Sequence, residues 1–357
     1  MRLTRIFYME NKKIRELLER LAQNHTLDFD EYVYLCENGE SELDYASNLA
    51  EKIRNEVYGR DVYIRGLIEV SNFCKNDCLY CGIRRSNREC ERYRLDKDTI
   101  LACCDEGYAI GFRTFVLQGG EDNHFTDEFV CDTVRSIKAK YPDAAVTLSL
   151  GERSHESYAA LREAGADRYL LRHETADSEH YARLHPSNLT LRNRIKCLYS
   201  LRELGYQVGC GFMVGSPYQT AENLARDLKF IEEFRPDMCG IGPFIAHHAT
   251  PFASFESGTL EKTLLMLALV RMIHPKVLLP ATTALGTIHE RGREMGILAG
   301  ANVIMPNLSP AEDRLKYMLY DNKLSSGAEA AENKKDLERR MKDIGYEIVT
   351  ARGDVKR

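Results

Sequence analysis

The sequence contains no apolar run long enough to cross a membrane. A membrane-spanning helix needs roughly 18 to 20 consecutive apolar residues, and Leu264–Val270, one of the longest runs, is much shorter. The opening residues MRLTRIFYMENKK reach charged side chains too soon to hold the apolar region of a signal peptide. The formal net charge of −5 and the pI near 6.1 also lack the positive excess typical of a nucleic-acid binder. We therefore expect a cytoplasmic protein that binds neither membranes nor nucleic acid.

Cysteine is absent after Cys239, and the eleven cysteines up to and including it do not make an even set. A secreted disulfide framework favours an even count in a short chain, so reduced thiols in a reducing compartment fit better. One group alone has the tight spacing of ligands. It consists of Cys74, Cys78 and Cys81.

The length of 357 residues suits one large α/β barrel or two ordinary domains, and 44% hydrophobic with 29% charged residues indicates a soluble protein with a sizeable core. The first sixty residues have helical patterns. From Val62 onward, short β-rich runs alternate with longer amphipathic stretches. The sequence predicts eight strands, at Val62–Glu69, Thr114–Gln118, Ala145–Leu150, Asp167–Arg172, Gln207–Val214, Met238–Pro243, Val277–Ala281 and Asn302–Met305.

Eight strand–helix repeats predict a closed, parallel (β/α)8 barrel rather than an open doubly wound sheet. An open nucleotide-binding sheet would place a glycine-rich fingerprint after its first strand. Here that strand leads into Ser71-Asn72-Phe73-Cys74 instead. The predicted fold is an α/β protein of the TIM type, with a helical N-terminal extension over residues 1–60, a complete barrel over 61–322, and a C-terminal helical extension and tail over 323–357.

Polar residues gather where the predicted strands end, which is where barrel enzymes hold their reactive groups. Side chains two apart on a strand share a face, so Thr147 and Ser149 can point inward together, as can Arg172 and Glu174. The same alternation turns His173 outward, toward packing. The residues at strand ends are Gln118, Gly119, Gly120, Glu121, Thr147, Ser149, Arg172, Glu174, Thr282 and Thr283.

The segment CKNDCLYC places three thiols within eight residues in a C-x3-C-x2-C pattern. Three thiolates on one loop can hold one face of a cuboidal [4Fe–4S] cluster, and the missing fourth ligand would leave one iron open to a small molecule. A zinc site or chance spacing are the alternatives. Structural zinc requires four ligands, commonly in paired C-x2-C arms, and the sequence has no second arm.

This pattern, with the aromatic Tyr80 before its last cysteine, resembles the signature of the radical S-adenosylmethionine (SAM) superfamily. The resemblance implies that the amino and carboxylate groups of SAM bind the open iron, and that one-electron reduction cleaves SAM to a 5′-deoxyadenosyl radical. Gly119-Gly120-Glu121 resembles the segment that receives the SAM amino group in that superfamily. A glycine pair alone is weak evidence, but its place at the end of the second strand strengthens it.

Further blocks resemble the HydE family of [FeFe]-hydrogenase maturases. They are IEVSNFCKNDCLYCGIRR, VLQGGED, VTLSLGE, EAGADRYLLRHETA, GIGPFI, PATTALGT and GANVIMPN, and they cover roughly residues 62 to 320. Carried over to this sequence, the resemblance implies SAM contacts at Gln118, Thr147, Arg172, Glu174, Arg194, Thr282, Thr283 and Tyr317. Arg172 and Glu174 could instead form a structural ion pair, and Tyr317 could pack a terminal turn.

The resemblance also implies a function and partners. The enzyme would act in assembly of the diiron subcluster of [FeFe]-hydrogenase, on a cysteine-bound iron carbonyl–cyanide precursor supplied by the partner maturase HydG. HydF and an external one-electron donor are further expected partners. Some members carry extra cysteines after the eighth strand for a second cluster. AEDRLKYMLYDNKLSSG has none, so that cluster is expected to be absent.

Three rivals remain at this point. Biotin synthase needs inward cysteines for a second cluster, and QGGED has none, while Cys210 falls on the opposite face. A methylornithine synthase, which is an amino-acid mutase with one cluster, should present an acidic and a basic group deep in the barrel, and the sequence does not locate them. A non-catalytic iron–sulfur carrier normally closes the coordination of every iron and would not cleave SAM.

Overall fold

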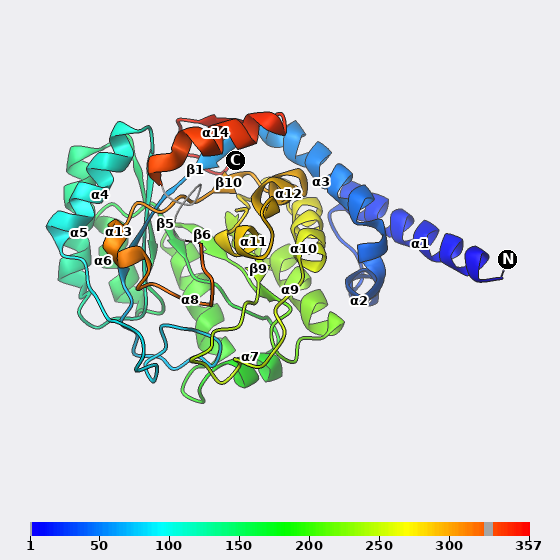
Figure 1. Ribbon diagram of the computed structural model, residues 1–357, viewed down its shortest axis with the longest axis horizontal. Helices are drawn as coiled ribbons and strands as arrows, with labels where there is room; N and C mark the ends of the chain where they lie inside the picture. Colours follow the sequence, from blue (N-terminus) through cyan, green and yellow to red (C-terminus); the bar gives the residue numbers. More distant parts are fainter. Residues whose placement is uncertain (1, 325–330) are drawn as a thin grey trace.

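The computed structural model describes residues 2–324 and 331–357. Three helices precede the first strand, as predicted: α1 (Arg2–Asn24), α2 (Phe29–Asn38) and α3 (Leu43–Tyr58), with a 3-10 turn (Gly39–Glu42) between the last two. A capping box between Asp28 and Glu31 begins α2. These helices pack against α9 (Ala221–Phe234) and α10 (Leu260–Ile273) at one side of the molecule, to the right in Figure 1.

Parallel strands form the wall of an α/β barrel. The six-stranded sheet has the order β2 (Gly66–Ser71), β3 (Thr114–Gly119), β4 (Ala145–Ser149), β5 (Arg168–Leu170), β6 (Gln207–Cys210) and β8 (Met238–Cys239). A second sheet has the order β10 (Val303–Ile304), β1 (Asp61–Ile64) and β11 (Glu347–Val349). Isolated parallel bridges from Met238 to Leu278 and from Pro280 to Val303 connect the two sheets on one side. On the other side β1 continues directly into β2, which completes the circuit.

The remaining elements surround this wall. They are α4 (Lys97–Ala109), α5 (Asp127–Lys140), α6 (His155–Glu163), α7 (Ser178–Leu184), α8 (Leu191–Glu203), α11 (Thr283–Ile288), α12 (Gly292–Leu298), α13 (Ala311–Arg314), a 3-10 turn (Ala331–Asn333), α14 (Lys334–Asp343), and the short pair β7 (Met213–Val214) and β9 (Gly242–Pro243). Most helices that follow strands begin at a side-chain cap. Thr126, Ser154 and Thr190, for example, each accept a hydrogen bond from the backbone N–H three residues on.

The longest apolar stretch of the sequence lies within α10. From Thr263 to Ile273 every residue of this helix is buried, because α9 and the N-terminal helices α1 and α3 cover it. A helix covered on all sides needs no polar face, which explains the run Leu264–Val270. Within the described part of the chain, no helix is both long and apolar enough to span a bilayer.

Several predicted strands are interrupted. The first divides at Arg65 into β1 and β2, and the fifth divides after Cys210, where Gly211 has φ 152°. The seventh, Val277–Ala281, forms only isolated bridges. Pro280 lies within it and has no N–H to donate to a ladder, which is one physical reason. Thr282 and Thr283 therefore follow a bridge and begin α11, a helix that the sequence pattern did not predict.

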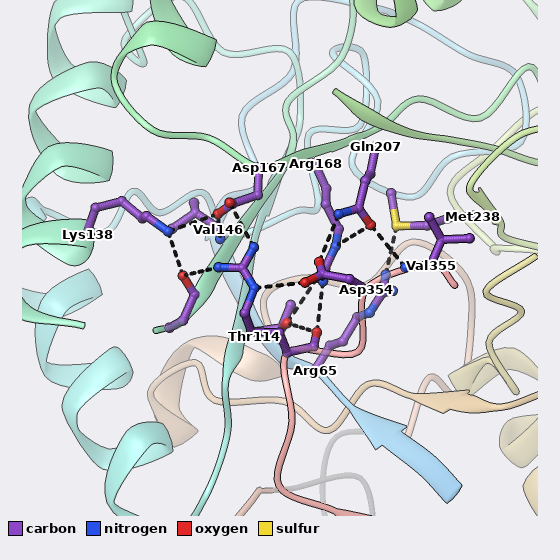
Figure 2. Close-up of polar contacts among 12 residues, drawn as sticks. Arg65, Thr114, Lys138, Val146, Asp167, Arg168, Gln207, Met238, Asp354 and Val355 are labelled. Atoms are coloured by element: carbon purple, nitrogen blue, oxygen red, sulfur yellow. Dashed lines mark hydrogen bonds and ion pairs between the residues drawn. The ribbon is translucent and has the colours of Figure 1, made fainter. Parts of the chain in front are cut away.

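The C-terminal segment closes the N-terminal end of the barrel. β11, which was not predicted, pairs with β1, and Figure 1 shows the C-terminus beside β1 and β10. Asp354 then accepts hydrogen bonds from Arg168 at 2.5 Å and from Gln207 at 2.8 Å (Figure 2). Arg352 contacts Asp167 at 3.0 Å. This segment is an ordered floor of the barrel, whereas the division into three units at residues 60 and 322 stays a prediction.

Candidate active site

A cavity of 370 Å³ opens at the C-terminal ends of the strands. Residues from the six-stranded sheet, from the short pair β7 and β9, and from the loops between Cys74 and Ile83 and between Tyr317 and Lys323 line it. Among the residues proposed from sequence, those that line the cavity are Cys74, Cys78, Tyr80, Cys81, Gln118, Gly119, Gly120, Glu121, Ser149, Arg172, Glu174, Arg194, Thr282, Thr283 and Tyr317. Thr147 is buried in the adjoining wall and does not line it.

The cysteine loop brings three free thiols to one wall of this cavity. Burial raises the pKa of each, and that of Cys81 to about 12. The neighbouring sulfurs raise the pKa of Cys78 further, through their mutual charge. Three thiols that resist deprotonation unless a cation is present are suited to a metal or an iron–sulfur cluster, because such groups bind thiolate.

Arg92 organises the same loop and was missed by sequence analysis. Its guanidinium donates to four backbone carbonyls, including those of Ile83 at 2.8 Å, Arg84 at 2.7 Å and Asn87 at 3.0 Å. Five donors in a fixed fork allow one arginine to satisfy several carbonyls of an irregular loop. No local motif marks this role, because arginine is common in this stretch.

Two glycines let other backbone segments approach the cysteine loop. A Cβ atom on Gly120 would lie 2.2 Å from the carbonyl oxygen of Phe73 and 2.8 Å from Cβ of Cys74. A Cβ atom on Gly82 would lie 2.1 Å from the carbonyl oxygen of Met318 and 2.2 Å from the ring of His247. The N–H of Gly82 also donates to Leu319 at 2.8 Å. The segment after α13 is thereby fastened to the residue that follows Cys81.

Glu121 is held in the wall beneath the loop. Its Oε1 accepts from the backbone N–H of Glu152 at 3.0 Å, and its Oε2 lies 3.3 Å from Nζ of Lys75. The side chain packs over Gly151, where any Cβ would lie 2.0 Å from Cγ of Glu121 and 2.4 Å from its carboxylate. A carboxylate fixed in this way faces the cavity with one orientation.

Arg172 and Glu174 lie together on the wall that follows β5. Their nearest atoms are 3.1 Å apart, yet Nε and Nη2 of Arg172 and Oε2 of Glu174 are buried without a hydrogen-bond partner in the described structure. Glu174 has φ 65°, a left-handed conformation that costs a non-glycine residue free energy. Buried polar atoms and a strained backbone at a cavity are features of sites that await a polar ligand.

His173, between these two residues, points away from the cavity. It is fully buried and contacts Asp227 at 3.2 Å, and Phe230 covers it. Burial lowers the pKa of His173 to about 3, so its imidazole is neutral at ordinary pH. Asp227 also accepts from the N–H of Ala176 at 2.6 Å. His173 and Asp227 therefore hold the turn that carries Glu174 from the side that faces away from the cavity.

Arg194 belongs to α8 and reaches the same wall. Its Nε donates to Glu152 at 2.6 Å, and Nη1 donates to the carbonyl of Arg172 at 2.5 Å. Although burial lowers the pKa of Arg194, Tyr181 and Glu152 raise it above its ordinary value. Arg194 is therefore a charged group already paired with a carboxylate, and Glu152 is a site residue that sequence reasoning missed.

The remaining predicted residues complete the opposite walls. Tyr317 is buried, which raises the pKa of its hydroxyl, and Gln118 partly opposes this rise. The hydroxyls of Thr147 and Thr282 are buried without a hydrogen-bond partner among the described residues. Gln118, Thr282 and Tyr317 face the cavity, whereas the hydroxyl of Thr147 lies in the wall behind it.

Comparison with known proteins gives the family. Residues 68–231 match the Radical SAM superfamily. The [FeFe] hydrogenase maturase subunit HydE of Thermotoga maritima is 44% identical over 312 residues, which is 87% of this chain and 88% of that protein. The chain belongs to the HydE family of radical SAM enzymes. The recognition made from the cysteine pattern and the strand blocks is thus confirmed.

More distant relatives share the fold. A 3-methylornithine synthase of Methanosarcina acetivorans is 28% identical and spans 92% of both chains. The crystal structure of methylornithine synthase (PylB) superposes with a TM-score of 0.83 at 24% identity, covering 93% of this chain and 97% of that one. At that identity the likeness concerns the fold, and it confirms the predicted α/β barrel of radical SAM enzymes.

Proposed function

We propose that this radical SAM enzyme acts in maturation of [FeFe]-hydrogenase, in assembly of the diiron subcluster. The observation that carries the proposal is the 44% identity to HydE over nearly the whole length of both proteins, against 28% to the methylornithine synthase. Specificity for a substrate resides in the site and not in the fold. The residues that line the cavity therefore determine which substrate is bound.

Cys74, Cys78 and Cys81 would hold a [4Fe–4S] cluster, with the fourth iron open to SAM. The residues present fit this group: three free thiols share one cavity wall, and among the other cysteines only Cys90 is not buried. Cys90 lies outside that wall and contacts the carbonyl of Lys316 at 3.8 Å. A set of three thiolates with no fourth sulfur is what an open iron requires.

SAM would bind across the walls from Gly119 to Glu174. Glu121 would receive its amino group, and Arg172, whose Nε and Nη2 have no hydrogen-bond partner among the described residues, would receive an anionic or polar oxygen. Tyr80, Gln118, Gly119, Gly120, Thr147, Ser149, Glu174, Arg194, Thr282, Thr283 and Tyr317 would supply the remaining contacts. The hydroxyl of Thr282 lines the cavity and has no hydrogen-bond partner among the described residues, which suits a ribose or adenine edge of a nucleoside.

When bound, the reduced cluster and SAM supply a carbon-centred radical. The chain's own contribution is enclosure. The segment fastened to Gly82 lies over the cluster side, and the C-terminal segment at Asp354 closes the far end. Exclusion of water and of stray hydrogen donors protects such a reactive species.

The substrate would be a cysteine-bound iron carbonyl–cyanide precursor delivered by HydG, with HydF receiving the product and an external donor supplying one electron. Deletion of the gene in a host that makes [FeFe]-hydrogenase tests this proposal. Hydrogenase should then keep its ordinary iron–sulfur clusters and lack the diiron subcluster, measured by infrared bands of bound carbonyl and cyanide. Normal hydrogenase in the deletion strain, together with rearrangement of lysine by the purified enzyme, would favour an amino-acid mutase.

A further inference from the structure

A second pair of opposite charges lies in the cavity wall, apart from Arg172 and Glu174. Glu69 projects from β2 and Lys323 comes from the segment after α13, and both line the cavity. Lys323 donates to Oε1 of Glu69, while Nδ2 of Asn307 donates to Oε2 at 2.8 Å. Both charged side chains are almost fully buried. Sequence reasoning had expected such a pair only for an amino-acid mutase and did not locate it.

A buried ion pair of this kind is expensive to maintain. Desolvation of two charges offsets much of their mutual attraction, so such pairs are weak evidence of a purely stabilising role. Glu69 also lies in β2, a strand whose six residues are all buried. A charged pair that lines a cavity can instead serve to bind a ligand, because it can replace some of its own hydrogen bonds with hydrogen bonds to that ligand.

The pair keeps unused hydrogen-bonding capacity. Nζ of Lys323 donates to Glu69 and to the carbonyl of Tyr317 at 2.9 Å, which leaves one of its three protons without a partner among the described residues. Each oxygen of Glu69 has one hydrogen-bond donor among the described residues and can accept a second. One free donor beside two free acceptors complements a molecule that carries a carboxylate next to an ammonium group.

The two charged pairs stand on different walls. Glu69 is in register with Gln118 of β3, while Arg172 and Glu174 follow β5, so β3 and β4 lie between the pairs in the sheet order. One SAM molecule has a single amino-acid end, which the cluster held by the cysteine loop and Glu121 would bind. A second zwitterion-binding pair is therefore left over for a second molecule.

We propose that Glu69 and Lys323 bind the α-amino-acid part of the substrate, with Lys323 receiving its carboxylate and Glu69 its ammonium group. This subsite rests on the proposed function, because the expected precursor carries a bound cysteine. Its chemical claim is broader: the substrate has a free α-ammonium and a free α-carboxylate. Tyr317, whose carbonyl accepts from Lys323, links the subsite to the predicted SAM contacts.

The test uses the anaerobically reconstituted full chain with SAM present. Binding of L-cysteine is compared by calorimetry with cysteamine, which lacks the carboxylate, and with 3-mercaptopropionate, which lacks the amine. We expect each analogue to bind at least about tenfold more weakly than L-cysteine, because each leaves one buried charge without its ligand. Equal binding of L-cysteine and both analogues would overturn the subsite. This comparison needs no variant and so decides even if a variant does not fold.

A double variant tests the residues themselves. Glu69→Gln with Lys323→Met removes both charges at similar side-chain size, and it should lose the discrimination between L-cysteine and its analogues. The matched control is Glu338→Gln with Lys334→Met, the same two changes in a pair of α14 far from the cavity. The control should discriminate as the unmodified protein does. Retained discrimination in the cavity variant would return the pair to a structural role.

Failure of the subsite and failure of the proposed function give different results. If L-lysine binds through Glu69 and Lys323 in place of L-cysteine, and hydrogenase survives gene deletion, the maturase function fails and the subsite stands. If neither amino acid binds the unmodified protein while hydrogenase loses its diiron subcluster on deletion, the subsite fails and the function stands.

Discussion

The hydroxyl of Tyr80 lies 3.2 Å from Nε2 of His185. Nδ1 of the same imidazole lies 2.9 Å from the carbonyl oxygen of Tyr181. A carbonyl can only accept, so Nδ1 carries the proton and Nε2 accepts from Tyr80. Burial lowers the pKa of His185 to about 3, which keeps this tautomer neutral over the working pH range. The tyrosine of the cysteine motif is thereby held in one orientation by a histidine at the end of α7.

His185→Phe and Tyr80→Phe should each raise the KM for SAM, because either change removes the hydrogen bond that orients the aromatic ring at position 80. The loss of one buried hydrogen bond is about 1 to 2 kcal/mol, or roughly five- to thirtyfold. The KM for SAM of the double variant should not exceed that of the more impaired single variant. Formation of 5′-deoxyadenosine against SAM concentration measures this. Fully additive effects would show that the two residues act separately.

Replacement of Cys74, Cys78 and Cys81 by alanine should abolish iron loading, because alanine cannot supply a thiolate. The unmodified chain should bind about four irons after anaerobic reconstitution. Cys90→Ala is the matched control, since Cys90 lies nearby but outside the cavity wall. Its iron content should equal that of the unmodified protein. A second cluster retained in the triple variant would contradict the single-cluster interpretation.

Glu174→Gln should weaken SAM binding while iron content stays unchanged. The change leaves Arg172, 3.1 Å away, without its anionic neighbour in a largely enclosed site. A loss of about 2 to 5 kcal/mol is expected for truncating one partner of a buried charged pair. Glu233→Gln on the exposed side of α9 makes the same chemical change and should bind SAM normally. Unchanged SAM affinity in Glu174→Gln would assign the pair to structure alone.

Gly82→Ala should impair iron retention, because its Cβ would overlap the carbonyl oxygen of Met318 and the ring of His247. One of the two segments would have to move, and the loop after Cys81 would open. Gly205→Ala is the control: it has φ 77° and open space around its Cβ position, so it tests backbone strain alone. It should cost about 1 kcal/mol of stability and keep iron. Equal iron retention in both variants would refute the packing argument.

Asp354→Asn should destabilise the fold at neutral pH, with an effect that fades in acid. Although burial raises the pKa of Asp354, hydrogen bonding from Arg352 and the charge of Arg168 hold it well below its ordinary range. A carboxyl with a lowered folded pKa stabilises above its unfolded pKa of about 4, and that contribution disappears as the pH falls through the folded pKa.

Urea unfolding at pH 7, 5, 4 and 3 measures this prediction. The difference between Asp354→Asn and the unmodified protein should be largest at pH 7 and should shrink below about pH 4. Asp132→Asn, at an exposed pair with Lys97, should change little at any pH. A difference that grows in acid would reverse the sign and refute the assignment.

Much of the barrel and the site was predictable, because the relevant signals are local. Alternation of strands and helices gives the fold, and polar residues at strand ends such as Arg172 and Thr282 fall around one cavity. The interruption at Arg65 was not predictable, since it depends on how β1 and β2 join different sheets. The Glu69–Lys323 pair joins positions 254 apart, and no spacing rule connects them. The role of His185 depends on its tautomer, which is determined by the neighbouring Tyr80 and Tyr181 and cannot be read from the sequence.

The position of β1 between β10 and β11 has a consequence for how the chain folds during synthesis. Thr114 and Arg168 make hydrogen bonds to the carbonyl of Arg352, which lies 238 and 184 positions further along the chain. The early strands leave the ribosome long before these partners exist, so the nascent barrel keeps Arg168 without its carboxylate and β1 with an open edge. Contacts so distant in sequence form slowly. The unfinished barrel is therefore the state in which this chain most needs a chaperone.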